Sequence, residues 1–227
     1  MKLSVLLKKE AYPILKTQFE HPFVKGLGDG TLPLDKFRYY MIQDSLYIVE
    51  YARAMAWVAP LLPNVKNILA MLDAAKQSFQ IEAMLKEQYF KQFGITMEGA
   101  LKTELAPTCK AYVDHLFRFT RSGTLAEGMA AILPCGWVYI EIGKKFTSGK
   151  EITDDHPYKD WLATYAVPEF RDMVNWWFEI LDDAVKGYPE TELNHIQDIF
   201  TKSCLYEWMF WDIGWNKQTW KLNHPQF

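Results

Sequence analysis

Apolar residues recur every three or four positions through nearly the whole chain, the spacing that places them on one face of an α-helix. Between residues 35 and 59, the apolar and aromatic side chains on that face are Phe37, Tyr40, Met41, Ile48, Tyr51, Met55 and Val58. No segment alternates convincingly with the two-residue period of a half-buried strand. A chain that buries its apolar residues along helices must pack helix against helix. We therefore expect an all-α, multi-helix bundle with several long helices and short connections.

The expected helices are separated by short stretches rich in glycine, proline and small polar residues, namely GLGDGTLP, FGIT, RSGT, TSGK and KGYPE. Their expected ranges are 4–20, 35–59, 64–93, 108–122, 124–147, 157–166, 168–186 and 190–214. The GLGDG stretch at 26–30 lacks the arrangement of a phosphate-binding loop, so we interpret it as a helix–helix loop. With 227 residues, 49% of them hydrophobic, the chain has the size of a single domain covering 1–227.

Charge and cysteine content limit the partners and the compartment. The net charge of −3 shows no basic excess of the kind that a nucleic-acid-binding face needs. The apolar run from Met129 to Ile140 is shorter than a membrane span, and the N-terminal apolar run is too short for a signal peptide. Three widely spaced cysteines suit free thiols in a reducing compartment. We expect a cytoplasmic protein that binds neither nucleic acid nor membrane.

The stretch ILPCGWVYIEIGKKF, residues 132–146, places a thiol in the longest apolar segment of the chain. Cys135 and Tyr139 are four positions apart and therefore lie one above the other on a helix. Pro134 removes a backbone donor beside the thiol and can kink the helix, and Gly136 allows another group to approach closely. The alternative is that Cys135 is a small buried packing residue, as we interpret the other two cysteines.

Two carboxylates interrupt apolar helix faces elsewhere. Asp44 falls in the apolar face of the 35–59 helix, with Tyr47 and Tyr51 on the same side. A carboxylate facing a core is costly unless it is bonded. Asp44 is therefore either a ligand-binding residue or a structural acid held by tyrosine hydroxyls or an arginine such as Arg53.

Glu207 lies among aromatic residues in the 190–214 helix, with Phe210 and Trp211 three and four positions further on. An apolar setting raises the pKa of a carboxyl and suits a general acid or base. The alternative is an acid that pairs with a lysine at the edge of the helix. Tyr112, on the 108–122 helix, is either a further wall of the same pocket or an ordinary core residue.

No metal or other cofactor is expected. Glu192 and His195 form a single E-x-x-H pair, whereas a di-iron helical bundle needs two such pairs and two further acids. The helices that carry the candidate residues are also poor in lysine and arginine near those residues, which argues against a phosphorylated ligand.

Several segments together resemble one known family over nearly the whole chain: HPFVKGLGDGTLPLDKFRYYMIQDSLY, AYVDH, LPCGWVYIEIGKKF, DWLATYAVPEF and YEWMFWD. The combination of LPC-x-W-x-Y with a late YE-x-x-FW is the most specific part. On these segments the chain resembles the TenA family, the thiaminase II or aminopyrimidine aminohydrolase group, and its cysteine-containing branch in particular. The chain departs from the family at Gly136, where a bulkier aromatic residue is expected.

The resemblance implies a haem oxygenase-like fold without haem and assembly as a homotetramer. It implies hydrolysis of 4-amino-5-aminomethyl-2-methylpyrimidine to the hydroxymethyl pyrimidine and ammonia, and slower cleavage of thiamin, for thiamin salvage. The family's nucleophile falls on Cys135 and its acid/base group on Glu207. The substrate-binding residues that the resemblance implies are Asp44, Tyr47, Tyr112, Tyr139, Tyr165 and Phe210. Periodicity alone does not single out Tyr165.

Two other functions remain open for a chain with these residues. A non-hydrolytic protein that binds a thiamin-related pyrimidine, for a partner or for regulation, would need Asp44 and the aromatic walls but not Cys135. An oxygenase of the same fold with a different ligand would be recognised by bound iron or an oxygen-dependent product.

Overall fold

The computed structural model describes residues 2–149 and 152–220, and within these ranges it contains helices and no strand. The elements are α1 (Leu3–Glu20), α2 (Pro22–Asp29), α3 (Leu34–Val58), a 3₁₀ turn η1 (Ala59–Leu61), α4 (Val65–Phe93), α5 (Met97–Leu101), α6 (Pro107–Arg121), α7 (Leu125–Thr147), α8 (Lys159–Thr164), α9 (Pro168–Ala184) and α10 (Glu190–Asn216). The expected all-α bundle is confirmed, and every expected helix is present with its ends within two residues of the observed ones.

Two short helices were missed. The interpretation of GLGDG as a loop is wrong for residues 26–29, which form the end of α2. This helix of eight residues is too short to show a helical period, but its end signals are present. The His21 side chain accepts the Phe23 N–H, Pro22 occupies the first turn, and Gly30 ends the helix with φ 78°. The five-residue α5, capped by Thr96, was missed for the same reason.

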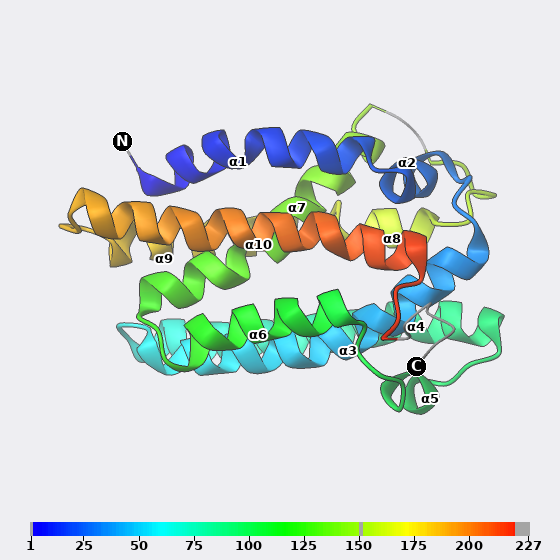
Figure 1. The fold of residues 1–227 in the computed structure, drawn as a ribbon, viewed down its shortest axis with the longest axis horizontal. Helices are drawn as coiled ribbons and strands as arrows, with labels where there is room; N and C mark the ends of the chain where they lie inside the picture. The colour runs from blue at the N-terminus through cyan, green and yellow to red at the C-terminus, as the bar shows by residue number, and fades with distance from the viewer. Residues whose placement is uncertain (1, 150–151, 221–227) are drawn as a thin grey trace, which may run out of the picture.

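The long helices form two groups that meet along α7 and α10 (Figure 1). In one group α1 packs on α10, which packs on α7, and α7 packs in turn on α9. In the other group α3 packs against α4 and α6. Because α7 and α10 also contact α3 and α6, they hold the two groups together.

The central helix α7 is almost completely surrounded by protein. It begins with a capping box, in which Thr124 and Glu127 bind each other's backbone N–H groups. From residue 128 to residue 140 every side chain is buried except that of Cys135, which is half-buried. In the described part of the chain α7 is the one helix long and apolar enough to cross a membrane, but 78% of its most apolar window is buried inside the bundle. It has the character of a core helix.

Close helix contacts depend on glycines of α7. A Cβ atom added to Gly143 would lie 2.8 Å from the backbone carbonyl oxygen of Tyr165, the residue that ends α8. A backbone atom cannot move aside as a flexible side chain can. Gly143 therefore sets how closely Tyr165 approaches α7.

We predict that Gly143→Ala destabilises the protein by about 1–3 kcal/mol through overpacking, although alanine is favoured over glycine in a helix by about 1 kcal/mol. Urea unfolding measures this change, and Lys144→Ala, one position away on the exposed side, is the control with little expected effect. Stabilisation by Gly143→Ala would contradict the tight contact.

Candidate active site

A cavity of about 640 Å³ lies between α3, α4, α7 and α9 and the segment after α8. Its volume is typical of small-molecule sites. The lining residues are Asp44, Tyr47, Ile48, Tyr51, Ala70, Asp73, Ala74, Gln77, Ser78, Cys135, Gly136, Tyr139, Thr164, Tyr165, Val167, Glu169, Phe170, Met173, Trp176 and Trp177. The half-buried Cys135 is thus the point at which the core helix α7 presents a reactive atom to a cavity.

The candidate residues from the sequence fall into two sets. Five of them line the cavity: Asp44, Tyr47, Cys135, Tyr139 and Tyr165. The other three do not line it: Tyr112, Glu207 and Phe210. This second set lies directly behind the wall, because Tyr47 contacts two of its members.

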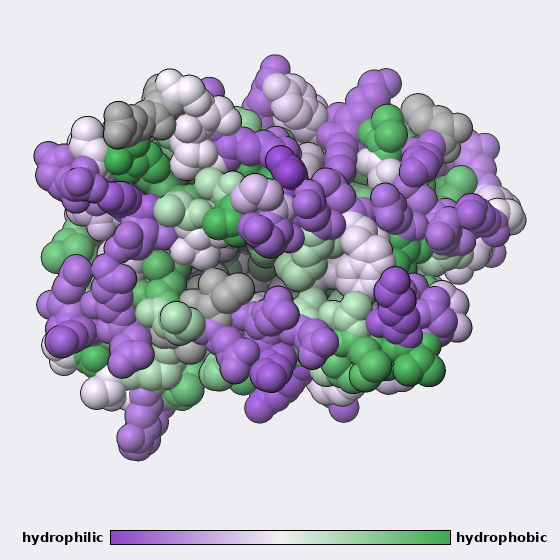
Figure 2. Space-filling model, turned by 180° about the vertical axis from the view of Figure 1, so that it is seen from behind, coloured by the Kyte–Doolittle hydropathy of each residue, from purple (hydrophilic) through white to green (hydrophobic). Residues whose placement is uncertain are grey.

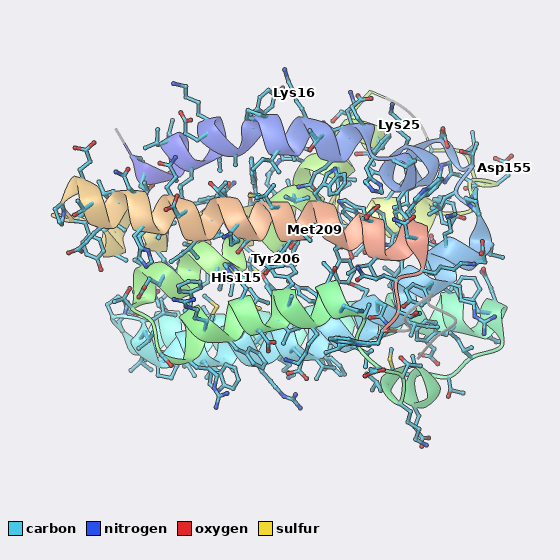
Figure 3. All side chains as sticks on the ribbon, viewed as in Figure 1. Lys16, Lys25, His115, Asp155, Tyr206 and Met209 are labelled. Carbon is cyan, nitrogen blue, oxygen red and sulfur yellow. The ribbon has the colours of Figure 1, made fainter. Side chains whose placement is uncertain are left out.

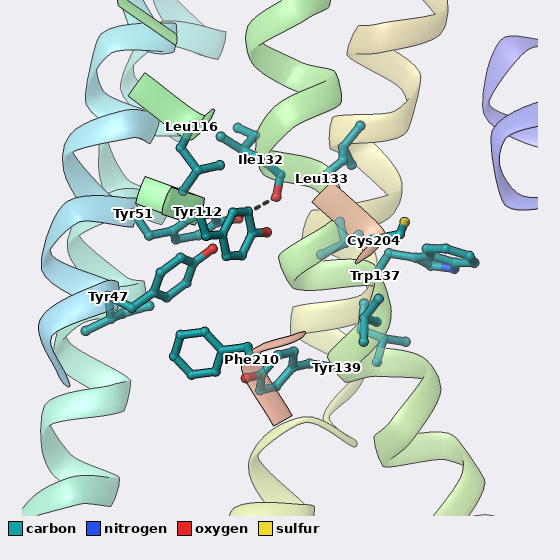
Figure 4. Packing of buried hydrophobic residues seen from close by; sticks show 14 of the residues in the cluster. Tyr47, Tyr51, Tyr112, Leu116, Ile132, Leu133, Trp137, Tyr139, Cys204 and Phe210 are labelled. Atoms are coloured by element: carbon teal, nitrogen blue, oxygen red, sulfur yellow. Dashed lines mark hydrogen bonds between the residues drawn. The ribbon is translucent and has the colours of Figure 1, made fainter. Parts of the chain in front are cut away.

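Tyr47 lines the cavity, and its ring also contacts residues of the second set. Its ring centroid lies 5.0 Å from that of Tyr112 and 5.3 Å from that of Phe210. Figure 4 shows these rings gathered between α3 and α7, with Tyr139 approaching from the α7 side. Tyr139 in turn packs edge-on against Tyr165, with centroids 4.8 Å apart, and its hydroxyl is hydrogen-bonded to that of Tyr40 at 2.8 Å. Aromatic side chains therefore form a continuous wall around the thiol.

Glu207 is a buried carboxyl, 2% exposed, that accepts a hydrogen bond from the Tyr112 hydroxyl. Burial raises the pKa of Glu207 to about 8; the Tyr112 hydrogen bond opposes this, and the charge on Asp44 adds to it. The alternative of an acid that pairs with a lysine at the edge of the helix is therefore wrong. At neutral pH Glu207 is mostly protonated and can donate a proton.

A second layer of side chains separates Glu207 from solvent. The Tyr112 ring stacks on Tyr206 with centroids 5.0 Å apart and planes 8° apart, and Tyr206 packs against His115. Figure 3 shows Tyr206 and His115 together where α10 meets α6. His115 Nε2 is 2.8 Å from Ser203 Oγ, and burial lowers the pKa of His115 to about 4. His115 is therefore neutral at physiological pH and supplies no counter-charge to Glu207.

Asp44 has a charged partner that was not predicted from the sequence. Lys86 Nζ on α4 lies 2.6 Å from Asp44 Oδ2, and the Lys86 side chain is completely buried. Arg53, the suggested partner, instead pairs with Glu50. A signal was available, because Lys86 precedes Tyr89 by three positions and Phe90 by four and so shares their buried face. Asp44 itself lines the cavity, whereas Lys86 does not.

Tyr51 lies on the same side of α3 as Asp44 and Tyr47 and also lines the cavity. Its hydroxyl donates to the Ile132 carbonyl oxygen at 2.9 Å, as drawn in Figure 4. Burial raises the pKa of Tyr51 well above its ordinary value, and the charge of Cys135 and a hydrogen bond to it add to this effect. Tyr51 therefore holds a polar group next to the thiol.

Two buried donors on the cavity wall have no hydrogen-bond partner among the residues described. They are the Tyr47 hydroxyl and the Trp177 indole N–H. Buried polar groups are nearly always satisfied by protein, water or a ligand. Trp177 is a buried core residue that also faces this cavity. Both groups can serve a ligand that fills the site.

Gly136 does allow a close approach, and the group that approaches is a side chain of α9. A Cβ atom added at Gly136 would lie 2.6 Å from Val174 Cγ2 and 3.5 Å from the Trp177 ring. A larger residue here would displace α9 from the cavity wall. The glycine therefore belongs to the packing that brings Trp177 to the site.

The other motif residues do not join the cavity. His195 Nε2 contacts Glu127 Oε1 at 2.9 Å, which links α10 to the capping box of α7. Cys109 and Cys204 are buried, 0% and 1% exposed, and absent from the cavity lining, in agreement with a packing role.

Residues 8–217 match the model of the TENA/THI-4/PQQC family. The chain belongs to this family. It is 34% identical over 224 residues to an aminopyrimidine aminohydrolase of Halalkalibacterium halodurans, covering 98% of this chain and 100% of that protein.

Solved structures also match this family member. A TenA homologue from P. horikoshii OT3 has a TM-score of 0.84 at 29% identity, covering 95% of this chain and 99% of that one. A Shewanella denitrificans OS217 domain with a heme oxygenase-like fold has a TM-score of 0.72 at 15% identity, covering 94% of this chain and 92% of that one. The expected family and fold are confirmed.

The raised pKa of Glu207 predicts a pH-dependent stability difference between this family member and its Glu207→Gln variant. Between the ordinary value of 4.5 and about 8, the unfolded carboxyl loses its proton while the folded one keeps it. The wild type therefore loses stability as pH rises through this window, whereas glutamine does not titrate. We expect the variant to match the wild type near pH 4.5 and to exceed it by a few kcal/mol, roughly, at pH 8. Urea unfolding at both pH values measures this difference, and an equal gap at the two values would contradict the buried, raised carboxyl.

Proposed function

We propose that this protein is an aminopyrimidine aminohydrolase of the thiaminase II type. It hydrolyses 4-amino-5-aminomethyl-2-methylpyrimidine to the hydroxymethyl pyrimidine and ammonia, and thiamin more slowly, in thiamin salvage. The observation that carries the proposal is the half-buried Cys135 in a tyrosine-lined cavity that also contains Asp44. Multifunctional thiamine biosynthesis proteins of Corynebacterium are among its relatives, which supports the pathway.

The reaction begins with the Cys135 thiolate, the nucleophilic form of cysteine. The thiolate adds to a ring carbon of the aminopyrimidine, and this C–S bond disrupts the aromaticity of the ring. The ring electrons then expel the amine from the exocyclic methylene. Asp44 binds the amino edge of the ring and orients it for attack, while Tyr47, Tyr139 and Tyr165 enclose the ring and exclude water.

Glu207 supplies the proton that the departing amine takes. Its carboxylate then accepts a proton from water, the hydroxyl adds to the methylene, and loss of the C–S bond restores the ring and the thiolate. Glu207 lies behind the cavity wall, but its charge raises the pKa values of Tyr47 and Tyr139, after the larger effect of burial. Because Glu207 does not line the cavity, the proposal requires that a tyrosine hydroxyl or a water carry the proton between the carboxyl and the amine.

The cavity accommodates either substrate. At about 640 Å³ it exceeds the needs of one pyrimidine ring, and its lining includes the exposed Asp73 and Glu169 and the half-buried Trp176. An aromatic side chain and two acids suit the cationic second ring of thiamin. The proposal therefore includes both activities at one site.

The proposal also covers domain organisation, compartment, assembly and partners. The protein is a single-domain, cytoplasmic homotetramer that acts on a small molecule and not on nucleic acid. The cysteines are all free, which suits the cytoplasm. Exposed apolar residues of α4 support a subunit contact: Val65, Leu69, Leu72 and Phe79. In Figure 2 apolar side chains appear between hydrophilic ones on the face opposite that of Figure 1.

The decisive experiment is release of ammonia from 4-amino-5-aminomethyl-2-methylpyrimidine by the wild type and Cys135→Ser, assayed side by side. We expect release by the wild type and none by the variant, because serine is a far weaker nucleophile at neutral pH. Binding of the pyrimidine to both proteins, measured by calorimetry, controls for the integrity of the cavity.

The other outcomes separate the alternatives. Release by both proteins would keep the reaction but remove Cys135 from the covalent role. Binding without release by either protein would favour a non-hydrolytic binding protein.

A further inference from the structure

The packing of α3 against α4 does not require the buried ion pair that lies between them. Asp44 and Lys86 are 2.6 Å apart, and their side chains are 8% and 0% exposed. Transfer of two charges into a protein interior costs several kcal/mol each, and the attraction between them often does no more than offset this cost. An apolar pair would serve the α3–α4 contact equally well. The charge on Lys86 therefore points to a role in the cavity that Asp44 lines.

Three other described groups that interact with Asp44 are not positively charged. Interaction with Asp44 raises the pKa values of Glu207 on α10, Tyr139 on α7 and Cys109 on α6, in each case after the larger effect of burial. All three are acids, so they are neutral or negative. None of them carries a positive charge, whereas the adjacent ammonium of Lys86 favours ionisation of Asp44.

The protonation state of Asp44 decides how it binds an aminopyrimidine. The amino edge of the ring presents an N–H donor next to a ring nitrogen that is an acceptor when neutral. A carboxylate only accepts hydrogen bonds, so it binds both positions when the ring nitrogen is protonated. A neutral carboxyl binds both positions with the proton on its own oxygen. The two arrangements contain the same atoms and differ in the position of one proton.

We propose that Lys86 is a positioning residue that keeps Asp44 ionised and thereby places this proton on the ring nitrogen of the bound substrate. The ring takes the proton from solvent on binding, and the proton returns to solvent after product release. A protonated ring is poorer in electrons, so its carbon accepts the Cys135 thiolate more readily. This inference rests on the proposed function, and it assigns ring activation to a residue that does not line the cavity.

The kinetic test compares Lys86→Met and Lys86→Arg with the wild type in the ammonia assay. Loss of the charge should lower kcat by about 100-fold, which is the usual rate effect of a correctly positioned proton. KM should change less than tenfold, because both arrangements still bind the ring. Arginine should recover much of the loss. Lys91→Met, at an exposed site on the same helix, is the matched control. An unchanged kcat in Lys86→Met, or a change in KM alone, would overturn the proposal.

A direct test locates the proton. The ring nitrogens of the pyrimidine are labelled with ¹⁵N and bound to Cys135→Ser protein with either lysine or methionine at position 86. The nitrogen that faces Asp44 should have the chemical shift of a protonated nitrogen with lysine and of a neutral one with methionine. A neutral shift in both proteins, or a protonated shift in both, would refute the role of Lys86.

The two proposals can fail separately. If the wild type binds the ring but releases no ammonia, the proposed function fails, and the nitrogen shifts still decide the role of Lys86. If the wild type does not bind the ring, both fail. Should Lys86→Met not fold, Lys86→Gln removes the charge while keeping a polar side chain, and it is judged by the same criteria.

Discussion

The structure depends on one constraint, which is that α7 has almost no solvent-exposed face. Polar groups in its central part that are not paired within the helix need a partner from a neighbouring helix, because unpaired polar groups in a core are costly. Tyr51 from α3 reaches the Ile132 carbonyl, and Tyr40, also from α3, reaches the Tyr139 hydroxyl. The same contacts that satisfy α7 also bring the tyrosines of α3 to the thiol. The contacts that stabilise the core therefore also form the candidate site.

Two buried carboxyl groups have partners of different character. Asp44 lies against a buried ammonium group, which favours its charged form. Glu207 has a phenol as its partner, and burial raises its pKa to about 8. The charge on Asp44 further disfavours a charge on Glu207. Separation of two acids into an ionised group and a proton donor is how hydrolytic sites assign the roles of binding and acid catalysis.

Much of the fold follows from local sequence, and the site follows only in part. Helical spacing locates the long helices and shows that Asp44 interrupts an apolar face, because both are properties of one helix. The contact between Asp44 and Lys86 joins two helices, and spacing within α3 carries no information about its partner on α4. Glu207 was recognised from its aromatic neighbours in sequence, but its position behind the cavity wall depends on how α10 packs.

Tyr165 illustrates the limit most clearly. It follows a helix of only six residues, and no period marks it. Its place at the cavity is set by Gly143, whose missing side chain lets the Tyr165 backbone approach α7. A glycine in the sequence indicates that another group can approach the backbone closely at that position, but it does not identify that group. Family resemblance could supply Tyr165 because relatives share the packing, which is the information that spacing lacks.

The position of the thiol follows from the same local chemistry of α7. Pro134 has no N–H, so it cannot bond the carbonyl one turn earlier, yet α7 continues through it from Leu125 to Thr147. Two residues before the proline, the Ile132 carbonyl receives the Tyr51 hydroxyl, which ties α3 to the helix one turn from Cys135. On the other side, Gly136 admits Val174 of α9. Cys135 is thus held between a fixed phenol and a tightly packed helix, so the sulfur is directed toward the cavity by contacts that also stabilise the core.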